Sequence, residues 1–164
     1  MLWLRSAVFT LLLPGTVLVG VPLWLSSGGA GDHALGVGPL RWIGLPLVVL
    51  GVAGLLWCIA DFARRGKGTL APVDPPKFVV RSGLYRITRN PMYVAVVTTL
   101  LGEALLFDSV PIALWAATVA VTVHLFVVLY EEPTLHDQFG EPYDAYRAAV
   151  PRWLRFTRAP SRER

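Results

Sequence analysis

Two short motifs contain residue types that could carry out chemistry. The first is Arg89-Asn90-Pro91-Met92-Tyr93. Asparagine is favoured just before a helix and proline in its first turn, so Asn90 and Pro91 should open a helix. The free N–H groups at a helix start attract anions, and Arg89 adds a fixed positive charge. The motif therefore suits a carboxylate or a phosphate. Plain capping beside an arginine that contacts lipid headgroups is the alternative interpretation.

The second motif is Tyr130-Glu131-Glu132-Pro133, which follows an apolar run. We expect the two carboxylates to end that helix, where the helix dipole makes negative charge unfavourable. A placement without electrostatic benefit favours a function, such as holding ribose hydroxyls or a cationic group. A polar stop signal at the membrane edge would also explain it.

Long apolar runs must position these motifs. The chain has 164 residues, of which 54% are hydrophobic and 16% charged, and its mean hydropathy is +0.55. Soluble chains average roughly 25% charged residues. The sequence predicts an all-α polytopic membrane protein, a single domain over residues 1–164, with about four transmembrane helices. The expected spans are residues 7–25, 40–62, 91–107 and 110–130. A cleaved signal peptide is the alternative for the first.

Charge predicts the topology. Of the fifteen basic residues, seven lie in residues 63–90 and six in residues 131–164. Four spans put both segments on the side of the N-terminus, and the positive-inside rule makes that side cytoplasmic. We therefore expect an inner-membrane protein with both termini in the cytoplasm. The net charge of +4 favours contact with a membrane surface over nucleic-acid binding. Cys58 is the single cysteine, and no metal-binding motif is present.

A turn at Asp108-Ser109 should fold the last two spans into an antiparallel hairpin. In that register His124 lies at the depth of Tyr93, and Glu131 lies opposite Arg86 and Ile87. Ionisable groups at membrane depth are candidates for function. A hydrogen bond to a neighbouring helix is the alternative role for His124. The residues expected to line one pocket at the cytoplasmic face are Arg89, Asn90, Tyr93, His124 and Glu131.

The segment after the fourth run predicts a short interfacial helix. Pro142 suits its first turn, and Phe139, Tyr143 and Tyr146 supply aromatic side chains. This helix would either anchor the tail to the membrane or cover the pocket as a wall or lid.

Residues 77–153 resemble the C-terminal region of the isoprenylcysteine carboxyl methyltransferase and phospholipid methyltransferase families. The resemblance rests on the order and spacing of several short motifs. These are Ser82-Gly83-Leu84-Tyr85, Arg89-Asn90-Pro91-Met92-Tyr93, Glu131-Glu132 with Leu135, Phe139-Gly140, Tyr143, Tyr146 and Val150-Pro151. It implies S-adenosylmethionine bound at the cytoplasmic membrane face. The matching cofactor-binding positions are Lys77, Phe78, Val79, Val80, Tyr85, Asn90, Pro91, Tyr93 and Glu131, beside which we expect Arg89 to hold the cofactor's carboxylate.

Two positions depart from the family pattern. Asn90 replaces the usual histidine, and asparagine can bond but cannot carry a proton near neutral pH. Val127 stands where the isoprenylcysteine enzymes have an arginine linked to substrate, which weakens the case for a prenylcysteine carboxylate.

The resemblance implies methyl transfer to a lipophilic acceptor, either a lipid amine or the carboxylate or thiol of a modified cysteine. An amine must lose a proton, and Glu132 or His124 are the candidate catalytic bases. One alternative is a non-catalytic membrane scaffold of the same fold. Another is an NADPH-dependent membrane reductase, in which Arg81, Arg86 and Arg89 would bind the nucleotide phosphates.

Overall fold

The computed structural model describes residues 14–29, 34–65 and 82–154. Apart from one isolated bridge between Ala34 and Ser109, the regular structure within these ranges is helical, which confirms the all-α class. The N-terminal elements are η1 (Thr16–Gly20), α2 (Val21–Trp24), η2 (Leu25–Gly29), η3 (Gly38–Ile43) and α3 (Gly44–Arg65). The C-terminal elements are η4 (Gly83–Arg86), α4 (Pro91–Leu106), α5 (Val110–Phe126), η5 (Val127–Glu131), α6 (Glu132–Phe139) and α7 (Glu141–Ala149).

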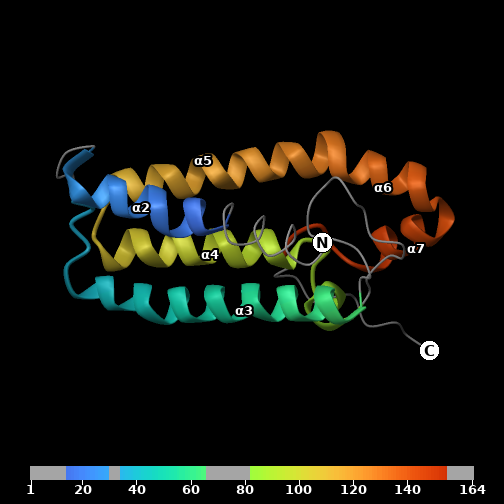
Figure 1. The fold of residues 1–164 in the computed structure, drawn as a ribbon, viewed down its shortest axis with the longest axis horizontal. Helices are drawn as coiled ribbons and strands as arrows, with labels where there is room; N and C mark the ends of the chain where they lie inside the picture. The colour runs from blue at the N-terminus through green and yellow to red at the C-terminus, as the bar shows by residue number, and fades with distance from the viewer. Residues whose placement is uncertain (1–13, 30–33, 66–81, 155–164) are drawn as a thin grey trace, which may run out of the picture.

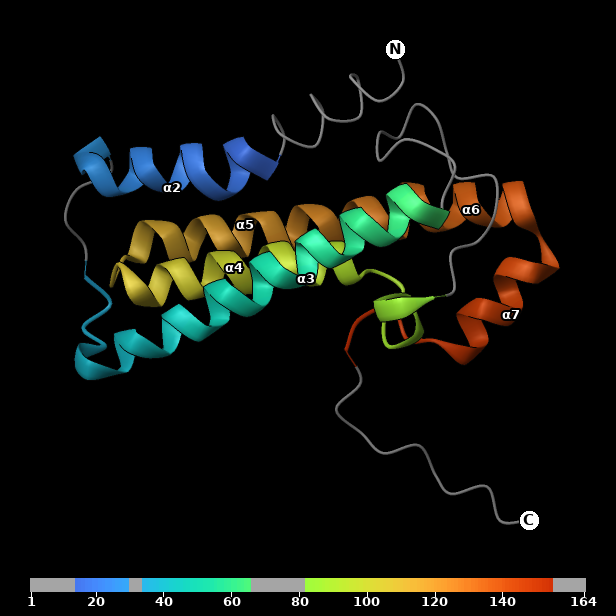
Figure 2. The same ribbon diagram turned by 60° about the horizontal axis from the view of Figure 1, so that its bottom comes forward.

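Helix α4 lies between α3 and α5, and the three run side by side along the molecule (Figures 1 and 2). The expected turn forms at Asp108, whose φ is +53°, and the Ser109 hydroxyl caps α5. The η1 turn joins the hairpin through a hydrogen bond of 3.0 Å from Trp115 Nε1 to the Val17 carbonyl. Helices α6 and α7 gather at the end of the bundle where α4 begins (Figure 1). This end carries both motifs.

Two helical stretches are long and apolar enough to cross a membrane. They cover Gly38–Asp61 and Val110–Phe139, and shorter apolar helices cover Thr16–Gly28 and Pro91–Leu106. The second and third predicted runs therefore agree with helices to within a few residues. Residues 7–13 of the first run lie outside the described ranges. The apolar helices fit a membrane protein.

The prediction that the fourth helix ends at the two glutamates is wrong. Instead of stopping at Glu131 and Glu132, the helix continues to Phe139 through the π-helical turn η5. Pro133 has no N–H and its ring would crowd the carbonyl four residues earlier, which normally breaks a helix. The wider π turn just before it accommodates the proline without ending the rod. The two carboxylates thus lie inside a continuous helix rather than at its negative end.

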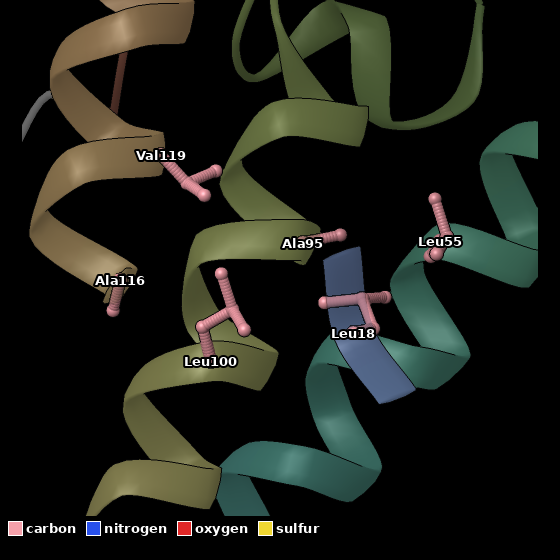
Figure 3. Packing of buried hydrophobic residues seen from close by; sticks show 6 residues of the cluster. All are labelled: Leu18, Leu55, Ala95, Leu100, Ala116 and Val119. Atoms are coloured by element: carbon pink, nitrogen blue, oxygen red, sulfur yellow. The ribbon is translucent and has the colours of Figure 1, made fainter. Parts of the chain in front are cut away.

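Helices α3, α4 and α5 share a core with the N-terminal segment. Figure 3 shows six of its side chains converging from four parts of the chain, namely Leu18, Leu55, Ala95, Leu100, Ala116 and Val119. Leu100 and Ala116 are almost fully buried. This cluster fixes the spacing of the helices that carry the site.

Glycines let the backbones of α3 and α4 touch. A Cβ atom on Gly51 would lie 2.7 Å from the Thr99 nitrogen and 2.8 Å from the Ala95 carbonyl oxygen. On Gly102 it would lie 2.7 Å from the Val48 nitrogen. Real Cβ atoms do not approach backbone this closely, so these positions require glycine. Small residues commonly permit such close helix packing in membranes.

Gly51→Ala should therefore destabilise the protein, by about 1–3 kcal/mol, because backbone must move to admit the methyl group. Gly54→Ala is the matched control, since its Cβ would meet only the Ala95 Cβ at an ordinary 3.6 Å. We expect the control to stay within about 1 kcal/mol of the parent, towards higher stability, because alanine favours helix. Thermal unfolding in detergent measures both. Equal behaviour of the two variants would contradict the close packing.

Candidate functional site

The chain just before α4 is held by a C-terminal strap, which we define as residues 150–153. The Arg89 N–H donates to the Pro151 carbonyl at 2.9 Å. The Arg152 carbonyl accepts from Thr88 Oγ1 at 2.9 Å and from Asn90 Nδ2 at 3.1 Å. Asn90 thus precedes α4 as expected, but its side chain does not cap the helix. It is buried and used to fasten the strap.

Glu132 lies between two arginines. Its Oε1 is 2.9 Å from Arg89 Nη1 and accepts from Arg152 Nε at 2.7 Å, and its Oε2 accepts from Arg152 Nη2 at 2.8 Å. The Arg89 and Glu132 side chains are only 9% and 7% exposed. Two guanidinium groups face one carboxylate here, so the triad carries a net positive charge. Such a buried group should attract an anion.

Arg89 has a donor to spare. Its Nη1 also donates weakly to the Tyr143 hydroxyl at 3.4 Å, but its Nε is buried without a hydrogen-bond partner among the described residues. Glu103 Oε2, towards the other end of α4, is the second such atom there. A buried N–H without an acceptor is costly and rare, so Arg89 Nε marks a place where an acceptor belongs.

The neighbouring Glu131 has a different environment. It accepts a hydrogen bond of 3.0 Å from the Tyr93 hydroxyl, which links η5 to the first turn of α4. Within the described ranges, the ion pairs involve Glu132 and Asp144 but not Glu131. Glu131 is half-buried, and among the described residues its carboxylate has a phenol but no ion-pair partner beside it. It can accept a cationic or hydroxyl group from a ligand.

Tyr85 lies on the other side of this region, in η4. The Tyr146 hydroxyl donates to its carbonyl at 2.7 Å, and Ser82 Oγ, at the start of the same turn, donates to Asp61 Oδ2 of α3 at 2.9 Å. Burial raises the pKa of the Tyr85 phenol well above its usual value, and nearby groups that include Glu131 add to the effect. Tyr85 is therefore neutral, with its turn clamped by α3 and α7.

His124 faces the strap. Trp153 Nε1 donates to His124 Nδ1 at 3.2 Å, with the ring centroids 6.0 Å apart. No hydrogen bond within the described ranges joins His124 to Tyr93 or Glu131. The Tyr93 hydroxyl instead contacts Glu131, seven positions after His124 in the sequence, which differs from the predicted pairing of Tyr93 with His124.

Comparison with known proteins adds the family. A sequence model described as phospholipid methyltransferase matches residues 40–142, well over half of the chain. The chain belongs to the phospholipid methyltransferase family. This confirms the resemblance seen in the motifs. No curated protein and no solved structure matches the chain. With the apolar helices, family membership indicates a membrane methyltransferase.

The structure of this phospholipid methyltransferase family member brings together most of the residues expected at the site. Arg89, Asn90, Tyr93 and Glu131 gather at the start of α4, with Pro91 buried in its first turn. Tyr85 lies close enough to Glu131 for the Glu131 charge to raise the pKa of its phenol. His124 is exposed and turned to Trp153. Lys77, Phe78, Val79 and Val80 lie outside the described residues.

Sequence reasoning missed several residues that hold the site. They are Asp61, Thr88 and Arg152. Arg152 was counted only among the basic residues of the tail. The charge balance of the motifs was a signal for Arg152. Two adjacent glutamates beside an apolar run need compensating cations, and Arg89 is only one cation. The buried Tyr143 and Tyr146 face protein, so α7 covers the site rather than anchoring in lipid through these rings.

The stability of this site should depend on pH. Glu132 lies beyond the apolar part of its helix. Burial opposes its ionisation, but the Arg152 hydrogen bonds and the charges of both arginines outweigh this and lower its pKa below 4.5. A carboxylate with a lowered pKa stabilises the fold above its ordinary pKa, and this contribution is lost as pH falls through the lower folded value.

Thermal midpoints in detergent from about pH 6 to about pH 3 test this expectation. The parent should lose stability on acidification more steeply than Glu132→Gln, which cannot ionise. Parallel pH curves for the two proteins would argue against an ionised Glu132 in the triad.

Proposed function

We propose that this protein is an integral membrane methyltransferase that uses S-adenosylmethionine to methylate a lipophilic acceptor. One observation carries the proposal. A buried, positively charged triad lies directly beside Glu131, and among the described residues the Nε–H of Arg89 has no acceptor and Glu131 has no ion-pair partner. Opposite charges at adjacent positions suit a zwitterion, and S-adenosylmethionine carries a carboxylate together with ammonium and sulfonium charges.

The residues present fit this cofactor. Arg89 Nε would donate to its carboxylate, helped by the positive end of α4. Glu131, oriented by Tyr93, would accept from its amino group or ribose hydroxyls. The neutral aromatic ring of Tyr85 or Tyr93 could face the sulfonium.

The cofactor supplies a methyl group already activated by the sulfonium, so the protein mainly aligns the acceptor and excludes water. Few strong catalytic side chains are required. Glu132 is a poor base in this geometry because three arginine nitrogens occupy its oxygens. If the acceptor is an amine, the exposed His124 is the better candidate to take its proton. A lipid amine, or the carboxylate or thiol of a modified cysteine, is the proposed acceptor.

The proposed setting is the inner membrane, with four spans, both termini in the cytoplasm and the site at the cytoplasmic face. The two long apolar helices and the shorter Thr16–Gly28 and Pro91–Leu106 would form the four spans. The last of these covers only 16 residues, about 24 Å at 1.5 Å per residue, so the bilayer would thin there or the helix ends would lie in the headgroup region.

Membranes that contain this protein, incubated with methyl-labelled S-adenosylmethionine, test the proposal. Separation of lipids from proteins should show label in a lipid or lipid-modified fraction, and none with membranes lacking the protein. Cofactor binding without label transfer to any fraction would favour the non-catalytic scaffold. Binding of NADPH in place of S-adenosylmethionine would favour a reductase. Either result would overturn the proposed activity.

A further inference from the structure

We infer that Arg152 is a positioning residue: by filling the oxygens of Glu132, it keeps the Nε–H of Arg89 available for the cofactor's carboxylate. This inference rests on the proposed function. It concerns a residue beyond the segment matched by the family model, which ends at residue 142.

The geometry shows an unequal division of Glu132 between the two arginines. Arg152 binds it through two nitrogens, with Nε on Oε1 at 2.7 Å and Nη2 on Oε2 at 2.8 Å. Arg89 reaches only Oε1, through Nη1 at 2.9 Å. The fork of Arg152 therefore blocks the paired contact that Arg89 would otherwise make. Its Nε stays buried and unpartnered as a result.

Removal of Arg152 would expose Glu132 Oε2. Arginine and carboxylate prefer the two-bond fork geometry. Arg89 already contacts Oε1, so a small rotation would bring its Nε–H onto the vacated carboxylate. The Nε–H of Arg89 would then donate to Glu132 and would no longer be available to the ligand. Other parts of the site, such as the Tyr93–Glu131 hydrogen bond, do not involve Arg152 and would remain.

The strap makes Arg152 suited to this role. Its carbonyl is fastened by Thr88 and Asn90, the residues on either side of Arg89. The backbone of Arg152 thus holds the turn that carries Arg89, while its side chain holds the carboxylate that Arg89 contacts. The C-terminal strap therefore fixes the position of Arg89 and determines which of its N–H groups remain available to a ligand.

Isothermal titration of the purified full chain in detergent tests the inference with two ligands, S-adenosylmethionine and its decarboxylated analogue. In Arg152→Gln we expect affinity for S-adenosylmethionine to fall about tenfold to a hundredfold, the effect of one lost charged hydrogen bond. Affinity for the analogue should change by less than about threefold, because it has no carboxylate for Arg89 to bind. Arg41→Gln, an exposed arginine in η3 that contacts none of the site residues named above, is the charge-matched control and should leave both affinities unchanged.

An equal loss of affinity for both ligands would show a merely structural role and overturn the inference, as would no loss for either. If Arg152→Gln does not fold, Arg152→Lys keeps the charge without the fork and should show a smaller loss confined to S-adenosylmethionine. Failure of the parent protein to bind either ligand would instead overturn the proposed function, and with it this role for Arg152.

Discussion

Glu131→Gln should abolish measurable binding of S-adenosylmethionine while leaving the fold as stable as before, or more so. The carboxylate has a phenol but no cationic side chain beside it in the described part of the chain. Without ligand it is a buried charge with little compensation, which costs stability. Glutamine keeps the shape and can still accept from Tyr93, but it cannot compensate a ligand's positive charge.

The expected loss of affinity is a hundredfold or more, since truncating one side of a desolvated charge pair costs roughly 2–5 kcal/mol. Titration with S-adenosylmethionine and thermal unfolding, on the same preparation, measure the two effects. Glu141→Gln, an exposed carboxylate at the start of α7, is the matched control and should change neither. Retained binding in Glu131→Gln would remove Glu131 from the site. A lower thermal midpoint would mean that its charge serves the fold.

The two adjacent glutamates thus have different roles, and the partners of each carboxylate determine its role. Glu132 lies among arginine nitrogens and is held ionised, whereas the polar partner of the Glu131 carboxylate in the described part of the chain is the Tyr93 hydroxyl. Side chains of consecutive helical residues point in different directions, so one faces the strap and the other faces α4. Pairs of carboxyl groups in unlike environments are a common feature of functional sites. Here the difference separates a structural anchor from a ligand-binding group.

The starts of the helices near the site could be predicted from sequence. Pro91 and Pro142 lie in the first turns of α4 and α7, as expected, because proline's fixed φ and missing N–H fit that position. The turn at Asp108 also formed where two helical runs met a short polar break. Local chemistry decides these features, so a local pattern is enough to find them.

The partners of the site residues could not be predicted, because tertiary contacts override local preference. Asn90 is a good capping residue, but the strap's carbonyl competes for its side chain. Pro133 suggests a helix end, but the π turn before it absorbs the proline. Arg152 reaches Glu132 across twenty positions of chain, a pairing that no spacing rule encodes.

The largest expected loss of stability comes from Glu132→Ala. The change would leave Arg89 and Arg152 facing each other in a largely buried place without their shared carboxylate. Removing one partner of a buried ion pair costs about 3–5 kcal/mol, although the 30% exposure of the Arg152 side chain should place the value near the lower end. Thermal or denaturant unfolding in detergent measures it, and Asp137→Asn, an exposed carboxylate on α6, is the control.

A further variant separates two causes of that loss of stability, namely uncompensated positive charge and the loss of the Glu132 contacts. If uncompensated positive charge is responsible, the triple variant Arg89→Met, Glu132→Leu, Arg152→Met should recover most of the stability, because apolar residues of similar volume often replace a buried ion cluster at little cost. It should still fail to bind S-adenosylmethionine, because it lacks the Arg89 donor. A cost below about 1 kcal/mol for Glu132→Ala would instead be typical of an exposed ion pair and would contradict a buried triad. Stability regained without binding would show that apolar side chains can replace the three charged ones in the fold but not in the ligand site.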